Sequence, residues 1–325
     1  MKAVLAREFA PLERLVLTDV PARHAGPGAV VIAVSACGIN FMDGLIVEGK
    51  YQLKPPLPFS PGAEVAGVVR EVGSGVTGLE VGTRVLAVPG YGGFAEEVVT
   101  LARGVIPIPE QMDFVTAAAF PITYGTSHHA LRDRADLKSG ETLLVLGAAG
   151  GVGLTAVEIG KLMGARVIAC ASSEEKLALC REYGADELIN YTNTDLRERI
   201  RELTVGKGVD VVYDPVGGPY AEPALRSLAY LGRYLVIGFA SGEIPNLALN
   251  LLLVKTLSVI GVFWGAFARA APERSAANLE ELLGWYSAGR LRPHISARFP
   301  LERYSQALNM VMNRVAKGKV VLTVS

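Results

Sequence analysis

The stretch TLLVLGAAGGVG, residues 142–153, joins an apolar run to a cluster of glycines, and a helical pattern follows from Val152 to Met163. A strand, a glycine-rich loop and a helix in this order are typical of a dinucleotide-binding unit. On the fingerprint GxGxxG, the three positions are Ala148, Gly150 and Gly153. Gly150 would let the backbone approach a pyrophosphate, and Gly153 would let helix and strand pack closely. Because Ala148 replaces the first glycine, we expect a turn that tolerates a methyl group.

Glycines also end strands for steric reasons alone, so the surrounding pattern has to decide between the two interpretations. Apolar runs of strand length recur through the middle of the chain, at Thr142–Leu146, Arg166–Ala171, Glu187–Ile189, Val209–Tyr213, Tyr234–Gly238 and Leu257–Val262. Segments of helical length lie between most of them, at Val152–Met163, Glu174–Tyr183, Asp195–Leu203 and Tyr220–Leu228. This alternation predicts an α/β fold with a six-stranded, doubly wound parallel sheet of the Rossmann type. The helix start after the loop would offer N–H groups to phosphates, so we predict cofactor contacts from Ala149, Gly150, Gly151 and Val152.

The two ends of the chain have a different texture from the middle. Short β-branched runs separated by turns, at Ala29–Ala36, Glu64–Val72, Thr83–Val88 and Phe94–Thr100, predict a β-rich, barrel-like domain of antiparallel strands. A helical stretch, Phe114–Leu131, leads into the Rossmann pattern. The last part of the chain predicts helices at Pro272–Gly289 and Leu301–Arg314 and strands near His294–Phe299 and Lys319–Val324. We expect residues 1–122 to form a catalytic domain, 123–262 the nucleotide-binding domain, and 263–325 to complete the first.

Bulk composition limits the classes of function. Lys plus Arg and Asp plus Glu both number 32, so the net charge is zero and supplies no general field for nucleic acid or anionic membrane. The longest apolar stretch of the C-terminal half, Leu247–Val254, is too short to span a bilayer, and the N-terminus does not read as a signal peptide. Three cysteines without a CxxC pair fit a reducing, cytoplasmic compartment.

The residues after the second predicted strand bear on the choice of nucleotide. Sequences that bind NAD carry an acidic residue about 20 positions after the loop, where it accepts from the ribose 2′-OH. Here that position is Ser172, followed by Ser173 and Lys176. Hydroxyls and an ammonium favour a 2′-phosphate, so we predict NADPH over NADH. An alternative is that Ser172 and Glu175 form a capping box and that Lys176 is an ordinary surface lysine.

Several further motifs carry a family resemblance. They are NFMD at 40–43, LPFSPGAE at 57–64, GTSHHAL at 125–131, DPVGG at 214–218 and GRYLVIGF at 232–239. With these motifs the chain resembles the quinone oxidoreductase (ζ-crystallin-like) branch of the medium-chain dehydrogenase/reductases over nearly its full length. The resemblance implies a GroES-like catalytic domain built from both chain ends, the cofactor in a cleft between the domains, and a homodimer joined through the edges of the nucleotide-binding sheets.

Zinc-dependent relatives have ligands that this chain lacks. Those relatives bind zinc through a cysteine near the position of Asn40 and through a His-Glu pair at the position of Ala63-Glu64. Of these ligands, this chain has only Glu64. A catalytic zinc site takes three protein ligands, so we predict no metal. Without a Lewis acid, alcohol oxidation is disfavoured. The chemistry that remains is hydride delivery from NADPH to an electron-poor acceptor.

The resemblance also implies roles for individual residues. Asn40 would hydrogen-bond the acceptor oxygen, Tyr51 would donate a hydrogen bond or proton, and Asp43 would orient its neighbours. Each has an alternative: a turn asparagine for Asn40, for example, or an aromatic lid for Tyr51. Residues expected near the cofactor are Thr126, His129 (where many relatives have tyrosine), Tyr191, Gly238, Phe239, Ala240, Phe263, Trp264 and Lys319. The alternatives at these positions are packing within a helix or a strand, a dimer contact, and, for Lys319, an ordinary lysine of an edge strand.

Three functions remain open from the sequence. The first is a zinc-independent NADPH:quinone reductase. The second is an NADPH-dependent reductase of activated alkenes such as an enone, an enal or an enoyl thioester like acryloyl-CoA, for which Arg269, Arg274 and Arg292 could bind phosphates. The third is an NADPH-binding structural or RNA-binding protein, which the neutral charge and the absence of a basic-aromatic stripe disfavour.

Overall fold

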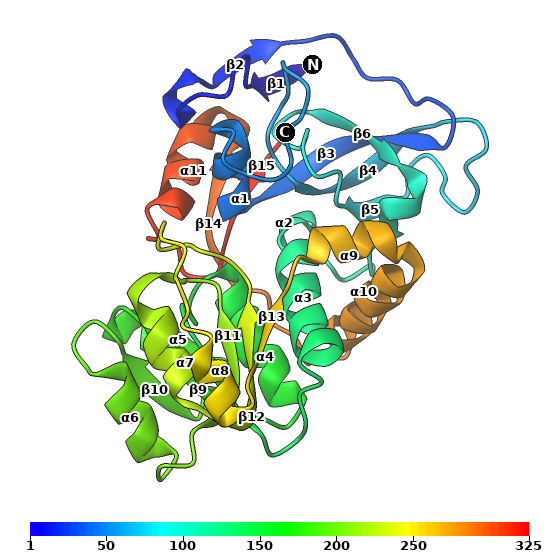
Figure 1. Ribbon diagram of the computed structural model, residues 1–325. Coiled ribbons are helices and arrows are strands. Elements are labelled where there is room, and N and C mark those ends of the chain that lie inside the picture. The colour runs from blue at the N-terminus through cyan, green and yellow to red at the C-terminus, as the bar shows by residue number, and fades with distance from the viewer. Residues whose placement is uncertain (325) are drawn as a thin grey trace. The chain divides into compact units, whose positions relative to one another are not determined.

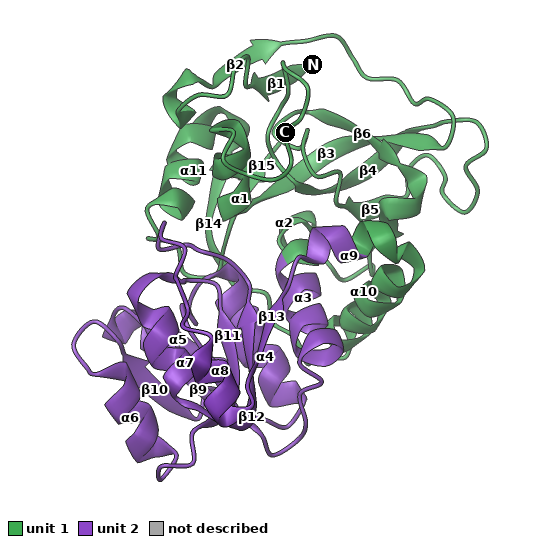
Figure 2. Cartoon of the chain, viewed as in Figure 1, with its two compact units in different colours: residues 1–122, 268–325 green, residues 123–267 purple. Residues whose placement is uncertain are grey.

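The computed structural model describes residues 1–324 (Figure 1). The chain divides into two compact units, shown in Figure 2. Unit 1 is Met1–Ile122 together with the chain from Ala268 onward, and unit 2 is Thr123–Phe267.

Unit 2 is built on a parallel sheet of six strands within the described residues. The strands are β8 (Thr142–Val145), β9 (Arg166–Ala171), β10 (Glu187–Asn190), β11 (Val209–Asp214), β12 (Leu228–Val236) and β13 (Ser258–Gly261). Their order is β10-β9-β8-β11-β12-β13, and every neighbouring pair is parallel. The order reverses between β8 and β11, which is the doubly wound arrangement, so the predicted fold class is confirmed. Buried Val, Ile, Leu and Ala dominate β8 and β9, as expected for strands that are covered on both faces.

Helices connect and flank these strands. They are α3 (Pro121–His128), a π-helical segment η3 (His129–Arg134), α4 (Gly151–Leu162), α5 (Glu174–Glu182), α6 (Leu196–Leu203), η4 (Gly218–Tyr220), α7 (Ala221–Arg226), α8 (Asn250–Lys255) and α9 (Trp264–Ala270). Short polar side chains start several of them. Asp195, for example, caps α6 by accepting from the backbone N–H of Glu198 at 2.8 Å.

Unit 1 contains a mostly antiparallel sheet that uses strands from both ends of the chain. The sheet order is β14-β15-β3-β4-β5-β7, with β6 also paired to β3. The strands are β3 (Ala29–Ile39), β4 (Glu64–Val72), β5 (Arg84–Ala87), β6 (Glu97–Leu101), β7 (Val105–Pro107), β14 (Ile295–Pro300) and β15 (Lys319–Thr323), and β1 (Lys2–Leu5) pairs separately with β2 (Val16–Asp19). The helices are η1 (Leu12–Arg14), α1 (Phe41–Val47), η2 (Ala102–Gly104), α2 (Phe114–Ala118), α10 (Pro272–Ser287), η5 (Leu301–Arg303) and α11 (Tyr304–Met312). Because β15 pairs antiparallel with β3 in the register Val320↔Ile39, the C-terminal strand lies beside the start of α1.

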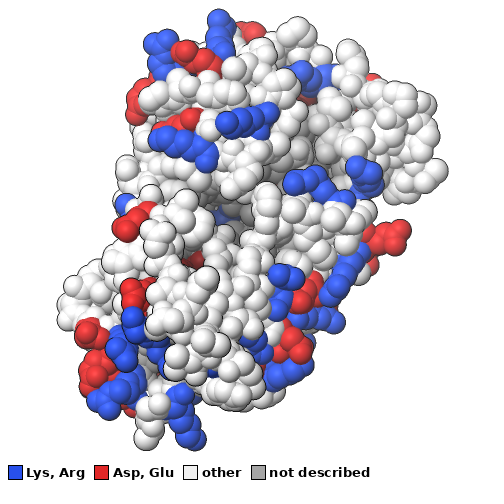
Figure 3. All heavy atoms as spheres, viewed as in Figure 1, with Lys and Arg blue, Asp and Glu red and all other residues white. Residues whose placement is uncertain are grey.

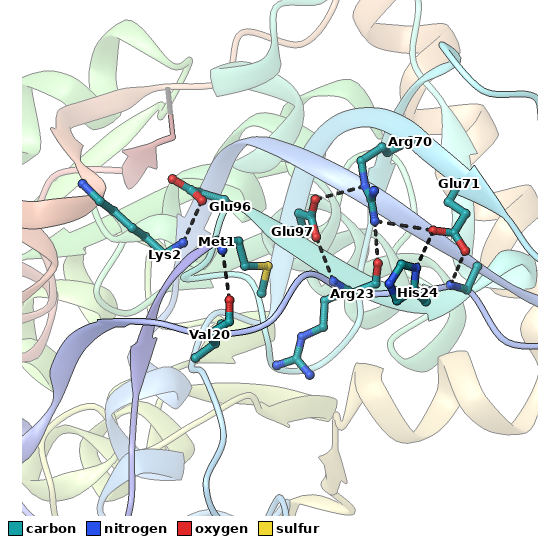
Figure 4. Close-up of polar contacts among 10 residues, drawn as sticks. Met1, Lys2, Val20, Arg23, His24, Arg70, Glu71, Glu96 and Glu97 are labelled. Atoms are coloured by element: carbon teal, nitrogen blue, oxygen red, sulfur yellow. Dashed lines mark hydrogen bonds and ion pairs between the residues drawn. The ribbon is translucent and has the colours of Figure 1, made fainter.

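Carboxylates of β4 and β6 fix the link between β2 and β3 (Figure 4). Glu97 accepts from the backbone N–H of Arg23 at 2.9 Å, and Glu71 accepts from that of Ala25 at 2.9 Å. Arg70 donates to the carbonyl of Arg23 and pairs with Glu97. These bonds give an otherwise irregular segment its backbone partners.

The structure corrects several predicted elements. The helical stretch expected over Phe114–Leu131 is interrupted between α2 and α3, because Pro121 lacks an N–H and disfavours helical geometry at the preceding residue, and α3 continues directly into η3. Helices α1, α8 and α9 were not predicted, since each is only six or seven residues long. Strand β12 begins at Leu228, earlier than the predicted Tyr234.

Candidate functional site

The loop between β8 and α4 has the conformation that the glycine cluster predicted, with one change. The residue in the left-handed region is Gly147, at φ +57°, so the tight turn lies one position before Ala148. Ala148 is fully buried and its N–H donates to the carbonyl of Cys170 at 2.9 Å. A methyl group at Ala148 is therefore accommodated. At Gly153, a Cβ would lie 2.2 Å from the Gly147 carbonyl oxygen, so the helix packs on the loop at a distance that only glycine permits.

The start of α4 is suited to bind an anion. Gly150 is the N-cap residue, and among the described residues no side chain caps the helix. The first-turn N–H groups therefore lack a side-chain acceptor and carry the positive end of the helix dipole. Beside them, the Ser127 hydroxyl of α3 donates to the Val152 carbonyl at 3.0 Å and so fixes α3 against this turn. The residues present thus fit the diphosphate of a dinucleotide.

The end of β9 brings together the residues predicted to discriminate between nucleotides. Ser173 is the N-cap of α5 and its hydroxyl accepts from the Lys176 N–H at 3.3 Å, so the cap is Ser173 and not Ser172 as in the capping-box alternative. Ser172 instead accepts from Lys176 Nζ at 3.2 Å. Tyr191 lies on the same edge, since its N–H donates to the Ala171 carbonyl at 3.2 Å and its ring lies 4.2 Å from that of Tyr220.

The loops after β11 and β12 meet next to the phosphate loop. The amide N–H groups of Gly238 and Ala240 donate to the carbonyls of Asp214 and Pro215, at 3.3 and 3.0 Å. A Cβ on Gly147 would lie 2.8 Å from a methyl of Val216, which places the loops after β8 and β11 in contact. Carboxyl-end loops at the point where strand order reverses are the usual ligand site of this fold.

The remaining predicted cofactor residues of unit 2 have mixed environments. Thr126 and His129 are buried, and the His129 ring lies 2.8 Å from Asp133 through Nδ1 and stacks on Phe267 at 3.9 Å. Trp264 is buried and packs against Gly125 of α3, where a Cβ would lie 2.8 Å from its ring. Phe239 and Phe263 are partly exposed, at 37% and 44%.

In unit 1, Asn40 lies in a buried polar cluster with Glu64 and Lys319. Lys319 Nζ donates to Asn40 Oδ1 at 2.8 Å, to Glu64 Oε1 at 2.7 Å and to the Ile39 carbonyl at 2.8 Å. Asn40 Nδ2 donates to Glu64 Oε1 at 2.8 Å, and Glu64 Oε2 accepts from the Ile122 N–H at 2.9 Å. An ammonium has three donors. All three are used inside unit 1, and a cofactor contact from Lys319 stays a prediction.

Asp43 and Tyr51 are close to this cluster. Asp43 Oδ2 accepts from the Asn40 backbone N–H at 2.7 Å, at the start of α1. Burial raises the pKa of Asp43 to about 7, while that hydrogen bond and the charge of Lys319 oppose the shift. Burial, together with the charge of Asp43, also raises the pKa of Tyr51, and the Arg269 guanidinium opposes this. Tyr51 is therefore neutral, and its hydroxyl keeps its proton for donation.

The described residues contain no group of three or more His, Cys, Asp or Glu side chains that could hold a metal ion. Within the same residues, no helix has the length and apolar character that crossing a bilayer requires.

Comparisons with known proteins agree with this geometry. Residues 26–110 match the alcohol dehydrogenase GroES-like domain, and residues 151–282 match the zinc-binding dehydrogenase family. The quinone oxidoreductase-like protein 2 homolog of Nematostella vectensis is 42% identical over 325 residues, covering 99% of this chain and 88% of the relative. The chain belongs to the quinone oxidoreductase family. It is an oxidoreductase of the medium-chain dehydrogenase/reductase superfamily, as the resemblance implied.

Solved structures of related oxidoreductases share the complete fold. Escherichia coli quinone oxidoreductase complexed with NADPH has a TM-score of 0.92 at 29% identity, covering 99% of this chain and all of the other. The CurK enoyl reductase has a TM-score of 0.90 at 26% identity, covering all of this chain and 99% of the other. The chain is thus similar in structure to proteins named for two kinds of acceptor.

Sequence reasoning alone missed two features of the quinone oxidoreductase site in this chain. The first is that Gly147 and not Ala148 makes the turn; the glycine one residue earlier was the available signal. The second is the partnership of Glu64 with Lys319, which are 255 residues apart in sequence. The signal was a lysine that opens an otherwise apolar strand, because a charge in such a place needs a partner.

Proposed function

We propose that this chain is a zinc-independent NADPH:quinone reductase. The observation that carries the proposal is the uncapped N-terminus of α4 behind the Gly147–Gly153 loop. A dinucleotide diphosphate is the ligand that such a helix start favours. The Escherichia coli relative, which was solved with NADPH, supports the same cofactor here. Domain roles follow from it: unit 2 binds the nucleotide and unit 1 supplies the groups that contact the acceptor.

NADPH is proposed over NADH because of the residues at the end of β9. No carboxylate stands at Ser172 to repel a 2′-phosphate, and Lys176 Nζ lies 3.2 Å from the Ser172 hydroxyl. The pair can bind a phosphate through charge-assisted hydrogen bonds. Tyr191, which follows β10, would lie beside the same phosphate, with Ser173 contributing its backbone N–H.

Bound NADPH supplies the hydride for the reduction. The chain's own residues then stabilise the charge that develops on the acceptor oxygen. Asn40 Nδ2 retains one N–H after its bond to Glu64, and we assign this N–H to the acceptor oxygen. Tyr51 stays protonated because burial raises its pKa, and its hydroxyl donates a hydrogen bond or proton to the oxygen of the acceptor as negative charge develops there. Asp43 fixes the Asn40 backbone through its own carboxylate.

A second candidate function is reduction of an activated carbon–carbon double bond. The similarity to an enoyl reductase favours it, as does the Arg269 charge near Tyr51. Both functions use the same residues for hydride and proton transfer, and they differ in the acceptor.

The test is a comparison of steady-state NADPH oxidation with 1,4-benzoquinone, 9,10-phenanthrenequinone, an enone and acryloyl-CoA. We expect the two quinones to have the highest kcat/KM. A higher kcat/KM for the enone or the thioester would replace the first function with the second. NADPH binding without turnover of any acceptor would favour the structural or RNA-binding role.

We also propose that the chain is a cytoplasmic homodimer. Strand β13 ends the sheet of unit 2, and no strand in residues 1–324 pairs with its outer edge. Exposed apolar side chains occur on the neighbouring elements, at Tyr230, Leu231, Leu249, Leu253, Val254, Val259 and Phe263. Figure 3 shows that the surface around α8 is largely uncharged. An unpaired edge beside such a surface favours pairing with a second copy.

The three buried free cysteines are compatible with a reducing compartment.

A further inference from the structure

Lys319 is a charged residue in a position that needs a specific reason. It begins β15, is only 6% exposed, and is surrounded by the first turn of α1 and the start of β4. Its ammonium donates to Ile39, Asn40 and Glu64, at 2.7–2.8 Å. A buried ion pair is weak evidence for stability, since apolar residues of similar volume often do as well. Stability alone therefore does not account for a lysine at this position.

Glu64 is held as firmly as Lys319. It is fully buried, and its Oε2 accepts from the Ile122 N–H in the first turn of α3, where a negative charge is favoured. Its Oε1 accepts from both Lys319 Nζ and Asn40 Nδ2, at 2.7 and 2.8 Å. A Cβ on Gly38 would lie 2.6 Å from the same Oε1 atom, so the carboxylate rests directly on the strand backbone. It has little freedom to move.

Together these two charges determine which way the Asn40 amide faces. The carbonyl oxygen faces the ammonium and the NH2 group faces the carboxylate. A 180° flip would place NH2 against the ammonium and the oxygen against the carboxylate, and both contacts would be repulsive. An asparagine without such neighbours can adopt either orientation.

We propose that Lys319 and Glu64 are positioning residues that hold the Asn40 amide in one orientation, with its second Nδ2 N–H directed to the acceptor oxygen. The inference rests on the proposed function, because it assigns a purpose to the orientation of Asn40. It gives Lys319 a role in the reduction step and none in binding the nucleotide.

The first test is the double variant Glu64→Gln/Lys319→Met. The introduced glutamine keeps an acceptor for the Ile122 N–H, and no net charge then favours either orientation of Asn40. We expect kcat for quinone reduction to fall about 10²-fold, which is the scale for a misplaced group near the reacting atoms, with the NADPH Kd unchanged. The matched control is Arg233→Met/Glu141→Gln, which removes a partly buried ion pair of unit 2 and should leave kcat unchanged.

The second test measures the amide directly. In protein labelled with 15N-asparagine, the Asn40 side-chain resonances should be sharp in the wild type and broadened or doubled in the double variant. An unchanged kcat with unchanged amide resonances would overturn the proposal. So would a raised NADPH Kd with an unchanged kcat, which would return Lys319 to the cofactor. If the wild type reduces no acceptor, the proposed function fails, while the amide resonances still test the positioning.

Chemical rescue separates positioning from folding. Lys319→Ala removes three carbons and the ammonium, which together correspond to propylammonium. We expect added propylammonium to restore kcat in a saturable manner. Tetramethylammonium carries the same charge without an N–H donor, and it should not. Equal rescue by both ions, or by neither, would contradict the requirement for a donor at Asn40 Oδ1.

Discussion

Ser172 and Ser173 are adjacent serines with different partners. The Ser173 hydroxyl caps α5, whereas the Ser172 hydroxyl accepts from Lys176 Nζ. Ser172→Asp would place a carboxylate where we expect the 2′-phosphate. We predict that the ratio of kcat/KM for NADPH to that for NADH falls at least about tenfold, because charge-assisted hydrogen bonds to a phosphate contribute about 1.5–3 kcal/mol.

Ser173→Ala is the control for this change, measured in the same assay and by urea unfolding. It should lower the free energy of unfolding by about 1 kcal/mol through the lost cap and leave the cofactor ratio unchanged. A shift of the ratio in Ser173→Ala alone would show that the phosphate is bound through the other serine.

Asp43 gives a pH dependence of stability. Its folded pKa of about 7 lies above the value of about 4 for an unfolded aspartate. Between these values the folded chain holds the proton more tightly, so the Asp43 contribution to the free energy of unfolding falls as pH rises from about 4 to 7 and is constant above. The difference in the free energy of unfolding between the wild type and Asp43→Asn, measured by urea unfolding at each pH, should follow this curve. A difference that is independent of pH would contradict the raised pKa.

The phosphate loop and helix α4 are in close contact at Gly153. A Cβ at position 153 would lie 2.2 Å from the Gly147 carbonyl oxygen. Gly153→Ala must therefore push α4 away from the loop, which should destabilise the chain by about 1–3 kcal/mol and weaken NADPH binding. In α10, by contrast, no described heavy atom lies within 4 Å of a Cβ at Gly284, so Gly284→Ala should stabilise by about 0.5–1 kcal/mol. Thermal unfolding measures the stability of the two variants, and titration with NADPH measures their affinity for the cofactor. Equal stability and equal affinity in the two variants would contradict the close packing at Gly153.

Elements that make a continuous buried pattern could be predicted from the sequence, and elements fixed by distant contacts could not. The run Arg166–Ala171 became β9 at the predicted residues, because a parallel strand covered on both faces is apolar along its length. Helix α1 is too short to show a helical period. Its role appears only when β15 places Lys319 beside Asn40. The strand, loop and helix of unit 2 were therefore predictable, because they are consecutive in sequence, whereas the polar cluster of unit 1 was not.

For the whole molecule, the proposed dimer depends on the outer edge of β13. Val259 lies on this strand and is 38% exposed. In a symmetric pairing, Val259→Lys would bring two like charges together, so we predict a dimer for the wild type and a monomer for the variant by light scattering after size exclusion. Val99→Lys changes a valine of similar exposure in β6 of unit 1 and should leave the dimer intact. A monomeric wild type would rule out the edge-to-edge assembly.

In the proposed function, the Gly147–Gly153 loop holds NADPH for metal-free hydride transfer to a quinone. The most direct measurement is single-turnover oxidation of bound NADPH by 9,10-phenanthrenequinone after dialysis against a chelator. We predict a first-order loss of NADPH absorbance at full amplitude. The rate constant should be lower for NADPH deuterated at the transferred position. In Gly153→Ala the amplitude should fall, because that variant binds less NADPH. No quinone-dependent loss of absorbance, or a loss that returns only when zinc is added, would contradict metal-free hydride transfer from NADPH to a quinone.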